Sequence, residues 1–254
     1  MDYSYIGAGK VYIKDNSTPA GLLEVGNVSK LEFSVEEDAI ELRDYTSPGG
    51  GVLNEVRRVK GVTATMTLHE LKAENVALML YGSTTGVNAG TVADEVVTGY
   101  PGRLTRLAHA GPVDVVVKND FEGAAGGTTF VAGTDYEVRP GGIFVLAGGD
   151  ITPGQTLHVA YGYGVEDVIE ALTAAAKEYG LFFEGLNEAQ SGRPFLVDVH
   201  RIRFGATKAF SLIGDAFAGF EVAGKVLKDT TKTGAGVSQF FKATSQQVAA
   251  VPAG

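Results

Sequence analysis

The chain has 254 residues, enough for one large core or for a domain with an insert, and it carries 21 basic against 30 acidic residues. Its net charge of -9, with no basic run longer than Arg57-Arg58, argues against stable nucleic-acid binding, because phosphate contacts supply most of that affinity. The absence of cysteine excludes disulfides, thiolate nucleophiles and zinc–sulfur sites.

Glycine is unusually frequent, with 35 residues, and its clusters separate short apolar runs. This pattern predicts many strands joined by turns, and therefore a mainly β fold. The first 30 residues lack an uninterrupted apolar stretch of signal-peptide length, and no run approaches the length of a membrane span. We therefore expect folding in a cytoplasm, without secretion and without a membrane partner.

The N-terminal third predicts an extended hairpin. Residues 3–14 predict two short strands around a glycine turn, and residues 30–36 and 62–69 each alternate apolar with polar side chains. Period two places the apolar set on one sheet face. A strand-like pattern resumes after a break at Glu37-Asp38, and residues 45–55 predict a loop with three consecutive glycines.

A short helix is predicted over residues 73–81, ending at Gly82, a residue that commonly stops helices. It is expected to pack on the hairpin's apolar face. The predicted core residues are Phe33, Val35, Val62, Ala64, Met66 and Leu80.

The remainder reads mostly as strands separated by turns. Residues 165–180 carry apolar side chains at helical spacing, which favours a helix, and residues 246–254 predict a flexible C-terminal tail. The predicted strands are 94–98, 104–108, 113–118, 135–139, 142–146, 156–161, 181–186, 195–204, 219–228 and 237–243.

No catalytic pattern stands out, so we expect a protein that is not an enzyme and has no metal or cofactor. The fragment Gly7-Ala-Gly9-Lys10 lacks the full spacing of a phosphate loop. The carboxylates at 36–38 and 166–167 are typical of solvated turns rather than of a glycosidase pair. The four histidines are isolated in the sequence: His69, His109, His158 and His200.

Three regions together resemble the major tail tube proteins of long-tailed bacteriophages. The first comprises residues 26–36 (GNVSKLEFSVE) and 40–43, and the second residues 60–82. The third comprises 181–187 (LFFEGLN), 195–203 (FLVDVHRIR), 220–227 (FEVAGKVL) and 238–242 (SQFFK). The resemblance lies in the order and spacing of these pieces and covers most of 5–82 and 181–243.

The resemblance implies a β-sandwich or barrel domain, residues 1–82 and 165–245, with one packed α-helix. Residues 83–164 would be a β-rich insert on the outer face, and residues 165–180 would form a strand rather than a helix. Subunits of that family are structural proteins of the virion tail. They form hexameric rings that stack, by helical assembly, into a tube holding the tape measure protein and conducting DNA during ejection.

By the same resemblance, the partners are other copies of the chain, the tape measure protein, the tail terminator, the distal tail proteins and DNA in transit without stable binding. Assembly would occur in the host cytoplasm. The ring-stacking loop would be Thr46, Ser47, Pro48, Gly49, Gly50, Gly51, Val52, Leu53 and Asn54.

The polar side of the two amphipathic strands is expected to line the channel, with its glutamates forming an acidic belt in a ring of identical subunits. The lumen-facing candidates are Glu32, Ser34, Glu36, Thr63, Thr65 and Thr67. Two other readings remain open: a virion-displayed β-sandwich adhesin or decoration protein, and a hydrolase on a β scaffold.

Overall fold

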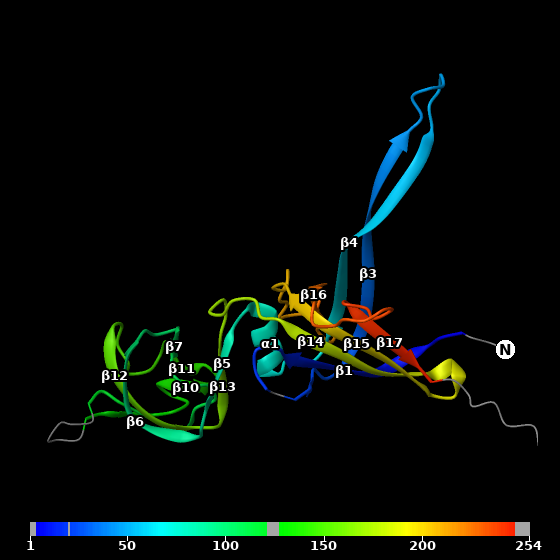
Figure 1. Cartoon of the computed structure of the whole chain (residues 1–254). Helices are drawn as coiled ribbons and strands as arrows, with labels where there is room; N and C mark the ends of the chain where they lie inside the picture. The colour runs from blue at the N-terminus through cyan, green and yellow to red at the C-terminus, as the bar shows by residue number, and fades with distance from the viewer. Residues whose placement is uncertain (1–3, 20, 121–126, 247–254) are drawn as a thin grey trace, which may run out of the picture. The chain divides into compact units, whose positions relative to one another are not determined.

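A computed structural model describes residues 4–19, 21–120 and 127–246 of the chain (Figure 1). The fold is mainly β, and the described residues contain one α-helix. The chain divides into two compact units: unit 1 comprises Met1–Ser83 and Ile169–Gly254, and unit 2 comprises Thr84–Val168. The predicted insert was 83–164.

Unit 1 contains an eight-stranded sheet with the order β2-β1-β14-β15-β16-β4-β3, and β17 also pairs with β15. The pairings are antiparallel. The strands are β1 (Gly7–Asp15), β2 (Leu23–Glu24), β3 (Val28–Arg43), β4 (Val52–Leu68), β14 (Tyr179–Asn187), β15 (Arg193–Phe204), β16 (Phe220–Val226) and β17 (Phe241–Ser245). A 3-10 turn, η1 (Glu188–Gln190), joins β14 to β15.

The sheet of unit 1 bends around its own core. The ring of Phe33 on β3 stacks on that of Phe241 on β17, with centroids 5.5 Å apart, although β4, β16 and β15 separate the two strands in the sheet order. Strict alternation builds this core: along β16, Phe220 and Val222 are buried while Glu221 and Lys225 are exposed. Apolar side chains at period two thus face inward, and the polar ones face out.

Helix α1 (Ala73–Leu80) covers one part of the core, as predicted for residues 73–81. Its buried apolar residues are Val76, Leu78 and Met79, whereas Leu80 is only partly buried. The left-handed residue that ends the helix is Tyr81 (φ 48°), not Gly82. Gly82 is needed for another reason: a Cβ there would lie 2.6 Å from the carbonyl oxygen of Glu170.

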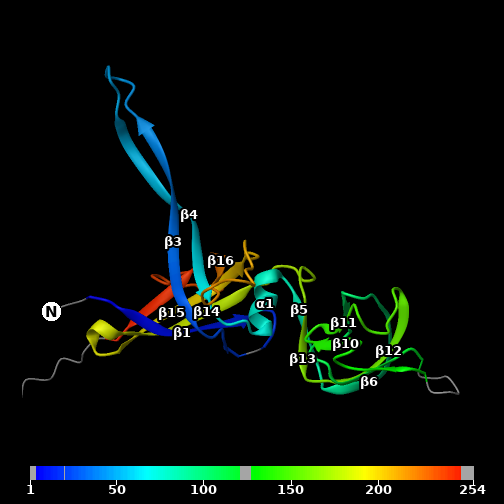
Figure 2. The same cartoon turned by 180° about the vertical axis from the view of Figure 1, so that it is seen from behind.

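The hairpin of β3 and β4 is longer than the sequence suggested. Its distal part leaves the sheet and forms a projecting arm (Figures 1 and 2). The predicted break at Glu37-Asp38 is wrong, because β3 continues through it with a register shift between Glu36 and Glu37. The predicted core position of Val35 is also wrong: Val35 lies where the strands leave the sheet, and its side chain is 53% exposed.

Unit 2 is an independent β module with its own buried cluster, which includes Val117, Ile143, Leu157 and Tyr161. One sheet has the order β6-β12-β8-β9 and the other β10-β11-β7. The strands are β6 (Gly90–Gly99), β7 (Leu104–Arg106), β8 (Val113–Lys118), β9 (Thr129–Phe130), β10 (Tyr136–Arg139), β11 (Gly142–Val145) and β12 (Gln155–Tyr163).

Strands β5 (Ser83–Val87) and β13 (Glu166–Glu170) form a two-stranded sheet where the chain passes between the units. The helix that periodicity favoured over 165–180 is therefore wrong: residues 166–170 are a strand and β14 begins at Tyr179. Two of the apolar residues that produced the helical spacing, Ile169 and Tyr179, instead pack against the core of unit 1 from the two strands. Of the predicted tail, only Gln246 is among the described residues.

Candidate assembly surface

The arm displays an apolar stripe on one face. Ile40 and Val56 are direct cross-strand partners, and Leu42 lies two residues further along the same face of β3. Their side chains are 54%, 50% and 54% exposed. Because residues i and i+2 of a strand share a face, these three side chains form one apolar surface, which the described residues of their own chain leave about half exposed.

The opposite face of the arm is largely charged. There Glu37 pairs with Val59, Ala39 with Arg57 and Glu41 with Glu55. The guanidinium of Arg57 lies 3.7 Å from Glu37 and also contacts Glu55. This ion-pair ladder lies in solvent, so it contributes little to stability, but it sets one arm face apart from the other.

The loop at the end of the arm runs from Asp44 to Gly51, because β4 already begins at Val52. Residues Val52–Asn54, predicted as loop, are therefore strand. The loop is ordered by its own hydrogen bonds: the Asp44 carboxylate accepts from Thr46 N (2.7 Å) and Ser47 Oγ (2.5 Å). These hydrogen bonds lower the pKa of Asp44 to about 2, and the bond from the Ser47 hydroxyl has the largest effect.

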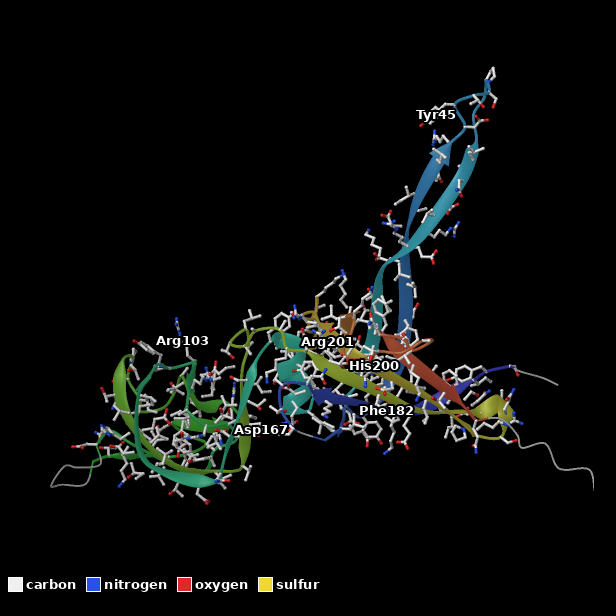
Figure 3. All side chains as sticks on the ribbon, viewed as in Figure 1. Tyr45, Arg103, Asp167, Phe182, His200 and Arg201 are labelled. Carbon is white, nitrogen blue, oxygen red and sulfur yellow. The ribbon has the colours of Figure 1, made fainter. Side chains whose placement is uncertain are left out.

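Tyr45 lies beside this turn, 86% exposed, at the far end of the arm (Figure 3). Gly49 and Gly50 have φ angles of 110° and 56°, a region that disfavours residues with a Cβ. The glycines therefore shape a defined turn that presents the aromatic ring, rather than only conferring flexibility.

The six predicted lumen-facing residues do lie on one face of the sheet, opposite the core. Glu32 is the cross-strand partner of Thr65, and Ser34 that of Thr63. Glu36 and Thr67 follow on the same face, where their partners are Gly61 and Lys30. The glutamates and Ser34 are exposed and the three threonines half-buried. Whether this face lines a channel stays a prediction.

The polar face is not uniformly acidic. The amine of Lys30 lies 2.5 Å from Glu32, and that of Lys60 lies 4.0 Å from Glu36. On β16, Glu221 and Lys225 continue the same face beside Thr67 and Thr63. Each glutamate thus has a nearby lysine, so the face presents balanced charge to solvent, and the structure gives no support to an acidic belt.

A second charged cluster lies on the outer side of β15. Glu178 accepts hydrogen bonds from Arg201 (2.7 Å) and Arg203 (2.6 Å). These contacts lower the pKa of the Glu178 carboxyl, and the hydrogen bond from Arg201 has the largest effect. Figure 3 shows Arg201 with His200 and Phe182 on this part of unit 1. These hydrogen bonds hold the segment that precedes β14 against β15, so the cluster has a structural role.

Each histidine has a local partner. His69 Nε2 lies 2.7 Å from Ser29 Oγ, and His109 Nδ1 lies 2.6 Å from Glu166. His158 Nδ1 lies 2.9 Å from Asp94, and His200 lies 4.0 Å from Asp198. Across the described residues, no group of three or more His, Asp or Glu side chains is placed to hold a metal ion. Nor does this part of the chain contain a helix long and apolar enough to cross a membrane.

Sequence reasoning missed the apolar stripe of the arm. Ile40 and Leu42 alternate with charged residues, which normally indicates a half-buried strand. Only the structure shows that they stay about half exposed, because in β3 they continue the polar face of Glu36 and not the core face of Phe33.

Comparison with family models matches residues 4–244 to the family described as protein of unknown function UCP028589. The chain belongs to this family. A search of curated proteins found no match. The family description states no activity.

Proposed function

We propose that this protein is a structural subunit of a phage tail tube, in which hexameric rings stack into a hollow tube. The observation that carries the proposal is the β3–β4 arm, a projecting hairpin with one apolar face. An apolar surface on an extended arm gains stability only when another molecule covers it. In an assembly of identical subunits, that molecule is another copy of the chain.

The sheet edge supports the same proposal. Strand β3 is at the end of the sheet order, so its outer edge carries backbone groups available for pairing along a strand of 16 residues. Such edges are templates for pairing with another chain, and closed rings of strands remove them. Pairing of β3 between neighbouring subunits would produce a continuous wall around a channel.

The polar face supplies a suitable channel lining. Short threonine hydroxyls on β4 alternate with buried core residues, and Lys30–Glu32 and Lys60–Glu36 form ion pairs on the same face. A wetted, charge-balanced wall offers no basic patch to hold phosphate, so DNA and the tape measure protein would pass without stable binding. The tail terminator and distal tail proteins would contact the two ends of the tube.

The test is to shorten the arm loop. Arg43 and Val52 are cross-strand partners, so a two-residue Asn-Gly turn can replace residues 44–51 without disturbing the hairpin. Purified wild-type protein at high concentration should form hollow tubes in negative-stain electron microscopy. The shortened variant should keep the wild-type melting temperature yet form no stacked tubes.

Two outcomes would count against parts of the proposal. Tubes of normal length from the shortened variant would refute the role of the loop in ring stacking and leave the tube assignment intact. A wild-type protein that stays a monomer or trimer at every concentration would instead favour the adhesin or decoration-protein reading.

A further inference from the structure

The loop between β15 and β16, residues 205–219, displays large apolar side chains to solvent. Leu212, Ile213 and Phe217 are 71%, 98% and 99% exposed, and we call these three residues the knob. Single exposed apolar residues are ordinary on protein surfaces, but three large ones within six residues mark an interaction site.

The base of this loop is held in place. Thr207 N donates to the Met79 carbonyl oxygen (2.8 Å), and His69 Nδ1 lies 3.0 Å from the Ala218 carbonyl oxygen. Phe210 packs its ring against Phe220, with centroids 5.3 Å apart. Both ends of the loop are thus anchored to unit 1, and the knob is presented between them.

Unit 1 also carries an apolar groove of about 450 Å³ between β1 and β3. Ser29 and Lys30 are polar residues at this groove, and Lys30 is the only charged one among its described lining residues. The apolar side chains that line it include Tyr5, Val11, Leu31, Phe33, Phe183 and Phe195.

We propose that the knob of one copy enters the groove of the neighbouring copy in the ring. This inference rests on the proposed function and names a lateral contact within it. An apolar cavity of about 150 Å³ is enough for a benzene molecule, so the groove has room for the Phe217 ring and the Ile213 side chain. Asp215, the only charged residue in 209–219, would then approach Lys30.

The geometry of the contact fits a ring. Knob and groove are different patches of the same unit, so the contact is heterologous and propagates head to tail until it closes. Three side chains bury far less than the roughly 1,000 Å² that a stable interface needs by itself. The contact would therefore act together with the arm, and dilute protein would remain monomeric.

The test uses single cysteines, because the chain has none of its own. Ala216→Cys reports from the exposed knob loop and leaves the three knob side chains intact, and Ser29→Cys reports from the exposed rim of the groove. The two variants are mixed, assembled and treated with a short bis-maleimide. Cross-linked heterodimers should form about a hundred-fold faster than in a control mixture of Val165→Cys with Ser29→Cys, because neighbours held together react at millimolar effective concentration. Val165 is 77% exposed and lies in unit 2.

A second variant, Ile213→Asp with Phe217→Asp, changes only exposed side chains, so its melting temperature should equal the wild-type value. Its critical concentration for assembly should rise about thirty-fold or more, as expected on loss of a buried anchor. Ala216→Cys cross-linked only to itself would overturn the proposal.

Failure of this inference is distinguishable from failure of the proposed function. Wild-type tubes together with mixed variants that do not cross-link would refute the knob contact and leave the tube assignment intact. Knob-to-groove cross-links in a protein that never forms rings or tubes would support the contact and refute the tube.

Discussion

The apolar stripe of the arm yields a quantitative prediction for assembly. In the double variant Ile40→Ser/Val56→Ser, a cross-strand pair loses its apolar side chains at positions that are 54% and 50% exposed. Complete burial of such a side chain contributes about 1.5–3 kcal/mol, so covering the exposed half of both would contribute about 1.5–3 kcal/mol per arm. The critical concentration for tube formation should therefore rise about 10–150-fold.

The assay is sedimentation of assembled protein over a concentration series, with negative-stain microscopy of the pellets. The isolated subunit should lose little stability, because exposed substitutions usually change it by less than about 0.5 kcal/mol. Val59→Ser is the matched control: Val59 is 53% exposed on the opposite, charged face of the arm. Assembly of the double variant at the wild-type concentration would refute the reasoning, and an equal effect of Val59→Ser would refute the choice of face.

Two further predictions concern the subunit itself. Met79→Ala should lower the free energy of unfolding by about 2–5 kcal/mol, since Met79 is fully buried. Leu80→Ala should lower it clearly less, because Leu80 is only partly buried. Urea denaturation that ranks the two variants the other way would show that the buried face of the helix is misassigned. Because the pKa of Glu178 is lowered in the folded state, its pairing with Arg201 and Arg203 stabilises the protein above the ordinary glutamate pKa and is lost as the pH falls through the lowered value. Glu178→Gln should therefore lower the urea midpoint of unfolding at pH 7 and change it little at strongly acidic pH. An equal decrease at both pH values would contradict this linkage.

Local patterns in the sequence were sufficient for much of the fold. Alternation in residues 30–36 and 62–69 predicted the two body strands, because side-chain direction in a strand has period two whatever the surroundings. The apolar spacing and following glycine predicted α1 within one residue of its observed end. Glycine clusters predicted a mainly β chain, since they mark turns between short strands.

Tertiary structure decided what these patterns leave open. Residues 166–170 are a strand despite helical spacing, because β5 pairs with them, and pairing between distant segments is invisible in a local window. Val35 alternates like a core residue, yet it is exposed because the hairpin leaves the sheet at that point. Ile40 and Val56 lie on the other face of the hairpin, which in the body of the sheet carries Glu32 and Ser34, and they stay about half exposed. The sequence determines that apolar side chains share a strand face, but only the arrangement of neighbouring strands determines whether that face is covered or is left for another molecule.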